Sequence, residues 1–224
     1  MKRRDFLLFG SILSTNIASA CHYSSVGSNS SIPSAKNGQV DNTFSQENNS
    51  PMANFDFIQI RQPQIYDIVN IPIKVCGVAT GFEGVIQYRL RDEQGKELKA
   101  SLFNVGSNGV FQEFLAEIPL ETKPQSALGI LEVFEINPGT GNEDHKVVIP
   151  LVFGSVLIND YYGFSLYTVK VGDTLAKIAQ QAYGEVNLSS KIFQANRDRL
   201  LNPNIVTPGQ ILRIPLGSNS RPLF

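Results

Sequence analysis

The chain has 224 residues, 42% of them hydrophobic, which suffices for one mid-sized domain and a small one. Its 19 basic and 20 acidic side chains give a formal net charge of −1, so no positive excess favours nucleic acid. The two histidines, His22 and His145, lack metal-ligand spacing, and Gly-x-Ser-x-Gly and Gly-Lys-Ser/Thr motifs are absent. The sequence therefore predicts a protein that is not an enzyme and has no cofactor or metal, although a glycosidase, which needs only two carboxylates, stays formally open.

Residues 1–20 predict an export signal. A basic cluster, Lys2-Arg3-Arg4, precedes an apolar stretch that is too short and too polar to cross a bilayer as a mature helix. The pair Arg3 and Arg4, followed by Phe6-Leu7, resembles a twin-arginine signal, which implies export in the folded state. Lys2 stands where Ser or Thr is usual, so the general secretory route stays open.

The signal ends in Ala18-Ser19-Ala20-Cys21, which resembles a lipobox. This resemblance implies acylation of Cys21 and a membrane-anchored lipoprotein of the cell envelope. Cleavage at an ordinary Ala-x-Ala site, giving a soluble periplasmic or secreted product, is the alternative. With Cys21 acylated, Cys76 is expected to be a small buried hydrophobe; without acylation, a disulfide between the two is formally possible.

Residues 21–54, which begin with the lipidated cysteine, predict a disordered tether. They are rich in Ser, Asn, Gly and Gln and cannot bury enough apolar surface to offset the entropy of ordering. Some thirty flexible residues have an r.m.s. span of roughly 30 Å. This length suits a protein that is rooted in a membrane and reaches toward a cell wall.

Residues 55–154 contain short apolar runs separated by turn signals such as Asn108-Gly109 and Asn137-Pro138-Gly139. Seven strands at this spacing predict an immunoglobulin-like antiparallel β-sandwich. The absence of Trp excludes the Cys…Trp…Cys core of antibody domains. The expected strands are Phe57–Arg61, Ile71–Ala79, Val85–Arg91, Glu97–Phe103, Val110–Ile118, Leu128–Ile136 and Lys146–Val152.

Several motifs in this block carry a family resemblance. They are Gln62-Pro63, Ile71-Pro72-Ile73, Val75 to Ala79, Phe82-Glu83-Gly84, Arg89 to Asp92 with Gly95, and Gly129 to Glu135. The block resembles the bacterial immunoglobulin-like domain family named after spore germination proteins. The resemblance implies an extracytoplasmic spacer or protein-interaction module without catalytic residues.

Residues 155–165, an apolar linker unlike a flexible Gly/Ser segment, are predicted to pack at the domain junction.

Residues 166–216 predict a small α+β domain, and residues 217–224 a loose tail. Tyr167 to Val171 reads as a strand, and Gly172-Asp173-Thr174 supplies a turn and candidate N-caps. Two apolar stripes at helical spacing then precede a closing strand at Ile211 to Pro215. The order strand, helix, helix, strand predicts two helices on one side of a two-stranded antiparallel sheet. The stripes are Leu175, Ile178, Ala179, Ala182 and Tyr183, and, more weakly, Leu188, Ile192 and Ala195.

This segment resembles a lysin motif (LysM), which implies binding of N-acetylglucosamine glycans such as peptidoglycan. By the same resemblance, two loops form a groove: Gly172, Asp173, Thr174 and Leu175 on one wall, and Pro203, Asn204, Ile205 and Val206 on the other. Backbone groups are expected to pair with the acetamide, and Leu175 and Ile205 to contact the methyl group and ring. Asn204 stands where many relatives carry Asp. The alternative is that Asp173 and Thr174 only cap a helix and Asn202-Pro203 only forms a turn.

The fold expected is mainly β plus small α+β: an immunoglobulin-like sandwich followed by a βααβ LysM domain. The expected function is that of a non-catalytic envelope lipoprotein that binds peptidoglycan, with the membrane reached through its N-terminal lipid and the sandwich as spacer or protein-interaction module. The alternative is a germination or envelope-assembly protein whose sandwich binds a protein partner while the LysM only localises it. A third possibility comes from potassium-binding proteins with a similar LysM, whose cation-binding partner domain is not evident in this sequence.

Overall fold

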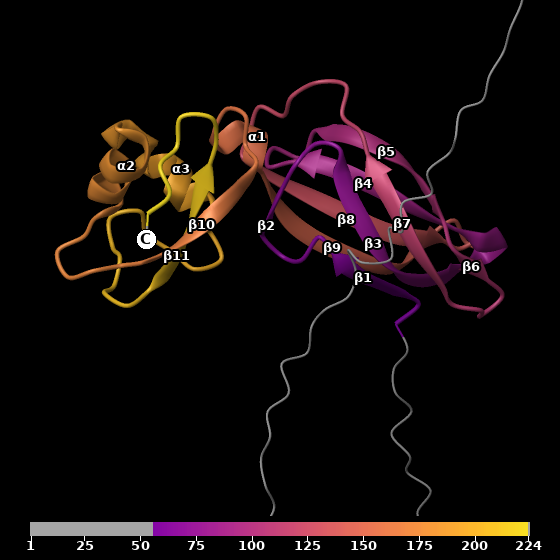
Figure 1. Ribbon diagram of the computed structural model, residues 1–224. Helices are drawn as coiled ribbons and strands as arrows, with labels where there is room; N and C mark the ends of the chain where they lie inside the picture. Colours follow the sequence, from indigo (N-terminus) through magenta and orange to yellow (C-terminus); the bar gives the residue numbers. More distant parts are fainter. Residues whose placement is uncertain (1–55, 224) are drawn as a thin grey trace, which may run out of the picture. The chain divides into compact units, whose positions relative to one another are not determined.

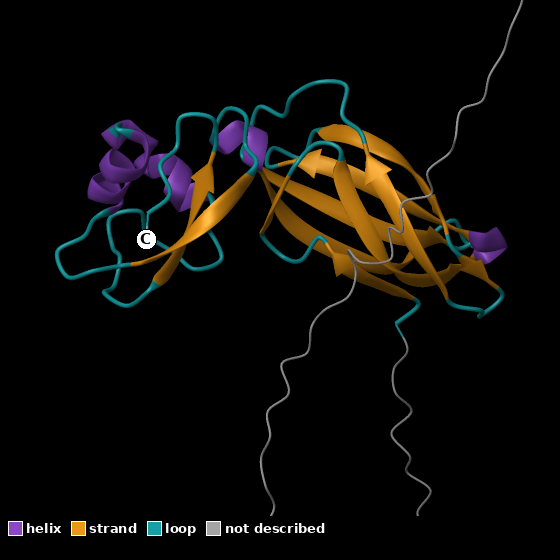
Figure 2. Cartoon of the chain, in the orientation of Figure 1, coloured by secondary structure: helices purple, strands orange, loops and turns teal. Residues whose placement is uncertain are grey.

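The computed structural model describes residues 56–223 (Figure 1). The expected signal with Arg3 and Arg4, the acylation of Cys21 and the tether lie outside the described residues. The described chain is mainly β, followed by a small α+β region, as the sequence predicts (Figure 2). None of the helices in this part of the chain combines the length and the apolar character needed to cross a membrane.

One sheet of the β region has five strands. Their order is β2 (Asp67–Val69), β9 (Glu143–Phe153), β8 (Leu128–Ile136), β4 (Val85–Asp92) and β5 (Glu97–Asn104). Strand β4 shows how an alternating sequence gives a strand with one buried face. Its residues Ile86, Tyr88 and Leu90 are buried, while the residues between them are more exposed. All neighbours are antiparallel except β2 and β9, which pair in parallel.

The second sheet is built around β3 (Ile73–Gly81). This strand pairs antiparallel with β1 (Ile58–Gln62) and β7 (Gln112–Ile118), and its end pairs in parallel with β6 (Gly106–Ser107). A short 3-10 turn, η2 (Phe82–Gly84), leads into β4. The seven expected strands are therefore present as β1, β3, β4, β5, β7, β8 and β9, and β7 begins at Gln112 rather than at Val110.

The facing sides of the two sheets form one apolar core. It includes the fully buried side chains of Ile73, Val75, Leu90, Leu131 and Leu151. Burial of this kind is worth about 1.5–3 kcal/mol per large aliphatic side chain before the entropy of ordering is subtracted. The apolar residues that alternate along the strands thus form the core between the two layers of a sandwich.

The α+β region has a two-stranded sheet, β10 (Gly163–Thr168) and β11 (Ile211–Leu216), which are antiparallel. Between them lie α2 (Leu175–Tyr183), the 3-10 turn η3 (Val186–Leu188) and α3 (Ser189–Gln194). The apolar stripes of the helices share a core with the sheet, in which Ile178, Ile192, Leu212 and Ile214 are fully buried. The strand expected at Tyr167 to Val171 is instead Gly163–Thr168, so Lys170 and Val171 lie in the loop that follows it.

Residues 155–165 are ordered and include most of α1 (Gly154–Leu157) and the start of β10. Leu157 packs in a small buried cluster with Val152 of β9 and Ala195, which follows α3. The Lys191 ammonium donates to the Val156 carbonyl at 3.0 Å. These contacts tie α3 to the segment that follows the sandwich.

Candidate functional site

The loop that follows β10 is closed by Asp173. Its carboxylate accepts hydrogen bonds from the Lys170 N–H and the Tyr167 hydroxyl, both at 2.8 Å, and its own N–H donates to the Lys170 carbonyl at 3.1 Å. Gly172 has φ +84°, a conformation that favours glycine because it has no Cβ. The turn therefore depends on both Gly172 and Asp173.

These bonds also fix the charge of Asp173. The Lys170 N–H, and then the Tyr167 hydroxyl, lower the pKa of the Asp173 carboxyl. Burial, and then the hydrogen bond to Asp173, raises the pKa of Tyr167. The Asp173 carboxylate is thus ionised and committed to shaping the loop.

Helix α2 begins at the end of this loop. The Thr174 hydroxyl caps it by accepting from the Lys177 N–H at 3.2 Å, and the Lys177 ammonium donates to the Gly172 carbonyl at 2.7 Å. The N–H groups of Leu175 and Ala176 have no acceptor within the helix, because the first turn of any helix lacks preceding carbonyls. This wall can therefore offer backbone donors.

The second loop precedes β11 and uses two of its N–H donors internally. The Asn202 side-chain oxygen accepts from the Asn204 N–H at 2.8 Å, and the Asn202 carbonyl accepts from the Ile205 N–H at 3.3 Å. Pro203 has no N–H to donate. What this loop can present to a ligand is therefore its carbonyl groups.

The two loops leave the same end of the two-stranded sheet. Beyond the last pair of the ladder, the Val169 N–H donates to the Gln210 carbonyl at 2.9 Å, and the Gly209 N–H donates to the Val169 carbonyl at 2.8 Å. Leu175 of the first loop and Val206 of the second contribute to the same apolar core. The structure thus joins the two predicted walls at their bases.

The apolar side chains of the walls differ from the expectation in one respect. Ile205 is 64% exposed and is free to contact a ligand, but Leu175 is only 3% exposed because it starts the buried stripe of α2. The apolar contact expected from the Leu175 side chain is therefore wrong. Two residues that the sequence argument missed, Val171 at 90% and Leu201 at 99%, expose large apolar side chains on these loops. The sequence pattern that could have identified Val171 and Leu201 is an apolar residue that lies beside turn residues and outside both helical stripes.

Outside the two loops, Cys76 and His145 are the residue types from which a thiol-dependent catalytic pair could be built. Cys76 is buried in β3 and is not a free thiol, and the His145 ring stacks on Phe57 at 4.1 Å between centroids. A catalytic pair of Cys76 and His145 therefore does not exist in this structure. Within residues 56–223, no three His, Cys, Asp or Glu side chains are grouped to hold a metal ion.

Comparison with known proteins identifies both regions. Residues 57–142 match the family model described as the immunoglobulin-like domain of bacterial spore germination, and residues 167–215 match that of the LysM domain. Both are binding domains without a catalytic role.

Two curated proteins are similar over short stretches. The potassium binding protein Kbp of Escherichia coli O6:H1 is 57% identical over 49 residues, which is 22% of this chain and 33% of that protein. An uncharacterized protein of Deinococcus radiodurans is 47% identical over 53 residues, 24% of this chain and 20% of its own length. The matched stretches span a third and a fifth of these relatives, so potassium binding remains a property of the first relative.

Proposed function

We infer the function from the two domains that the chain carries, a LysM domain at residues 167–215 and an immunoglobulin-like domain of bacterial spore germination at residues 57–142. We propose that the protein binds peptidoglycan, or another N-acetylglucosamine glycan, through the LysM loops and does no chemistry on it. The sandwich then acts as a spacer or as a protein-interaction module in the cell envelope.

The observation that carries this proposal is the complementary polarity of the two loops. An acetamido group has one carbonyl, which accepts, and one N–H, which donates. The start of α2 offers the Leu175 and Ala176 N–H groups as donors. The opposite loop, in which the Asn204 and Ile205 N–H groups are used internally, offers carbonyls at Pro203, Asn204 and Ile205. One acetamide therefore has the groups to pair with both walls.

Apolar contact completes the proposed groove. Val171, Leu201 and Ile205 expose side chains that can cover the methyl group and the less polar face of a sugar ring. Gly172, Asp173 and Thr174 hold the first wall in shape, and Asn204 and Val206 hold the second. The ligand needs no charge for any of these contacts.

Export and lipidation are proposed from the sequence alone. The Arg3-Arg4 signal would deliver the chain to the envelope, and acylation of Cys21 would anchor it there, with residues 21–54 as the tether. Acylation and a disulfide to Cys76 exclude each other, because both consume the Cys21 sulfur. Acylation would block the only other cysteine of the chain, whereas Cys76 is not a free thiol in the structure, an observation that favours the disulfide. Mass spectrometry of the mature, unreduced protein from bacterial membranes decides between them. A diacylglyceryl mass on the peptide that begins at Cys21 supports the anchor, and a peptide pair joined through Cys21 and Cys76 overturns it.

The second candidate function gives the sandwich the main role, with the LysM only localising it. It is favoured by exposed apolar residues near one end of the sandwich, Phe82 at 49% and Val110 at 68%. Pairing of Thr80 with Gly106 and of Gly81 with Ser107 brings the segments that carry them together. Such a surface is typical of a site for a protein partner.

A pull-down of the mature chain with purified peptidoglycan sacculi tests the first function. We expect the wild type to sediment with sacculi and the double variant Leu201→Asp, Ile205→Asp to stay in solution, because the two carboxylates spoil the apolar contact. The double variant Leu115→Asp, Val148→Asp is the matched control, since these side chains are 44% and 48% exposed but lie in the sandwich. Sedimentation that survives deletion of residues 163–224 would overturn the proposal and favour the second function.

A further inference from the structure

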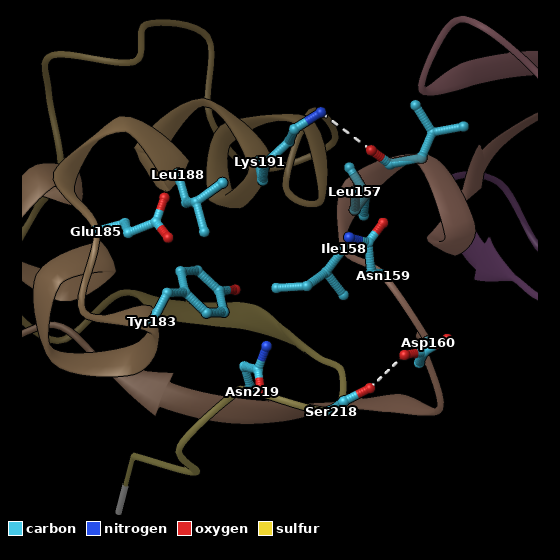
Figure 3. A pocket seen from close by; sticks show the side chains of 11 residues that line it. Leu157, Ile158, Asn159, Asp160, Tyr183, Glu185, Leu188, Lys191, Ser218 and Asn219 are labelled. Carbon is cyan, nitrogen blue, oxygen red and sulfur yellow. Dashed lines mark hydrogen bonds between the residues drawn. The ribbon is translucent and has the colours of Figure 1, made fainter.

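A cavity lies at the opposite end of α2 from the glycan loops. Its volume is about 460 Å³, and Figure 3 shows the side chains that line it. Ile158, Leu188 and the Tyr183 ring supply apolar surface, while Asn159 and Asn219 add amide groups. The size and the mixture of apolar and polar groups are those of a small-ligand site.

The charges of this cavity are unbalanced. Two carboxylates, Asp160 and Glu185, face one ammonium, Lys191, which gives the lining a net charge of −1. The Lys191 ammonium already donates to the Val156 carbonyl at 3.0 Å, and Asp160 accepts from the Ser218 hydroxyl. Across the described chain, no hydrogen bond or ion pair engages the side chain of Glu185, which is exposed. The cavity thus holds one carboxylate that is ready for a cationic partner.

The Tyr183 ring suits the same kind of ligand. Its hydroxyl donates to the Pro215 carbonyl at 3.0 Å, which fixes the ring in place. Figure 3 shows Glu185, Leu188 and the ring around one region of the cavity. An ammonium can pair with the Glu185 carboxylate and lie over the electron-rich ring, while its alkyl chain packs on Leu188 and Ile158.

The distance from the glycan loops matches a short peptide. Helix α2 has nine residues, so its ends are about 13 Å apart. Three extended residues span about 10–11 Å, and the side chain of the third residue reaches beyond that span. The polar residues Lys177 and Gln181 are exposed on α2 between its two ends and can contact such a peptide.

We propose that this cavity binds the amine-bearing side chain of a peptide that is joined to the glycan held by the LysM loops. The protein would then select the peptide-bearing glycan of bacterial walls over chitin-like glycans, which have the same acetamido sugar and no peptide. This inference rests on the proposed function, because the loops must first hold the sugar.

The test compares three soluble ligands by calorimetry on the mature chain. They are a bare disaccharide of N-acetylglucosamine and N-acetylmuramic acid, the same disaccharide with a tetrapeptide whose third residue is lysine, and that ligand with the lysine amine acetylated. We expect the free amine to improve affinity by about two- to fivefold over the other two ligands, as an ion pair with an exposed carboxylate does. Glu185→Gln should remove this advantage and Glu185→Lys should reverse it, with binding of the bare disaccharide unchanged in both. Glu117→Gln, an exposed acid on β7, is the matched control.

The outcomes separate the inference from the function it rests on. Equal affinity of wild type for the three ligands, or an amine advantage that survives Glu185→Lys, overturns the inference and leaves glycan binding intact. If none of the three ligands binds at all, the proposed function fails and this inference fails with it. Circular dichroism of each variant confirms that the domain stays folded, since the Glu185 side chain supports no contact within the described chain.

Discussion

The side chain of Asn196 pairs with the backbone of Arg213 as another strand would. Its oxygen accepts from the Arg213 N–H and its amide nitrogen donates to the Arg213 carbonyl, both at 2.8 Å, and the same nitrogen donates to the Ile192 carbonyl at 2.7 Å. Asn196 is fully buried. The residue thus joins the end of α3 to β11, from which the second glycan loop departs.

Asn196→Ala should destabilise the LysM domain by about 2–4 kcal/mol, because it leaves the buried N–H and carbonyl of Arg213 without partners. Denaturant unfolding followed by tyrosine fluorescence measures the loss. Asn219→Ala, at an exposed turn, is the control and should change stability by less than about 0.5 kcal/mol. A similar small effect at Asn196 would show that water replaces its hydrogen bonds.

Arg213 also connects the two domains. Its guanidinium donates to the Tyr66 carbonyl at 2.8 Å and to the Asp198 carboxylate, although the residue is only 5% exposed. We expect Arg213→Met to keep the alkyl packing but to let the LysM domain reorient relative to the sandwich. NMR relaxation should then give different correlation times for the two domains, where the wild type gives one. Arg221→Met, an exposed cation, should behave as wild type, and a single correlation time for Arg213→Met would show that the contact does not couple the domains.

Much of this architecture follows from local patterns in the sequence. The seven main strands alternate or carry β-branched residues, and the apolar stripe from Leu175 to Tyr183 predicts α2 with its C-cap at Gly184. Gly184 does end the helix, with φ +76° and its N–H bonded to the Gln180 carbonyl at 3.0 Å. These features depend on neighbours within a few residues, so the sequence alone suffices to predict them.

Other features depend on contacts that no local pattern encodes. Strands β2 and β6 have three and two residues, too short for alternation to be visible. The exposure of Leu201 and the burial of Leu175 are decided by where the core of the LysM domain lies. Likewise, Asn196 reads as a turn residue until α3 and β11 are brought together. The missed members of the candidate site are therefore those whose role is set by tertiary packing.

Acid should weaken the loop that Asp173 closes. Its pKa is lowered in the folded state, so its contribution to stability is present above the unfolded pKa and is lost as pH falls through the folded value, below about pH 4. We expect the unfolding midpoint of the LysM domain to fall over this range and glycan affinity to fall with it. Asp173→Asn should lower the midpoint at neutral pH and flatten the acid dependence. An unchanged pH profile in that variant would assign the effect to another carboxylate.

The sandwich has its own acid-sensitive cluster. Arg89 donates to Glu132 at 2.7 Å and to Glu143 at 2.9 Å, and Lys146 also contacts Glu143. The hydrogen bonds from Arg89 and then Lys146 lower the pKa of Glu143 to about 2. The stabilisation is therefore complete above about pH 4.5 and is lost as pH falls to about 2. Between about pH 4.5 and about pH 2, the unfolding temperature of Glu143→Gln should depend less on pH than that of the wild type, and Glu117→Gln should behave as the wild type. If Glu143→Gln and the wild type depend on pH equally, the acid sensitivity does not come from Glu143.

Salt should affect binding at the two proposed ligand-binding sites differently. The loops at Thr174 and Asn204 use backbone dipoles and apolar contact, so affinity for the bare disaccharide should change by less than about twofold between roughly 50 and 500 mM salt. The advantage conferred by a peptide amine depends on the exposed charge of Glu185, and ions screen such pairs. We therefore expect that advantage to shrink several-fold over the same range, measured by calorimetry with both ligands. A bare-disaccharide affinity that falls as steeply would mean that an ionised group lies in the glycan groove, and the polarity argument for the two loops would be wrong.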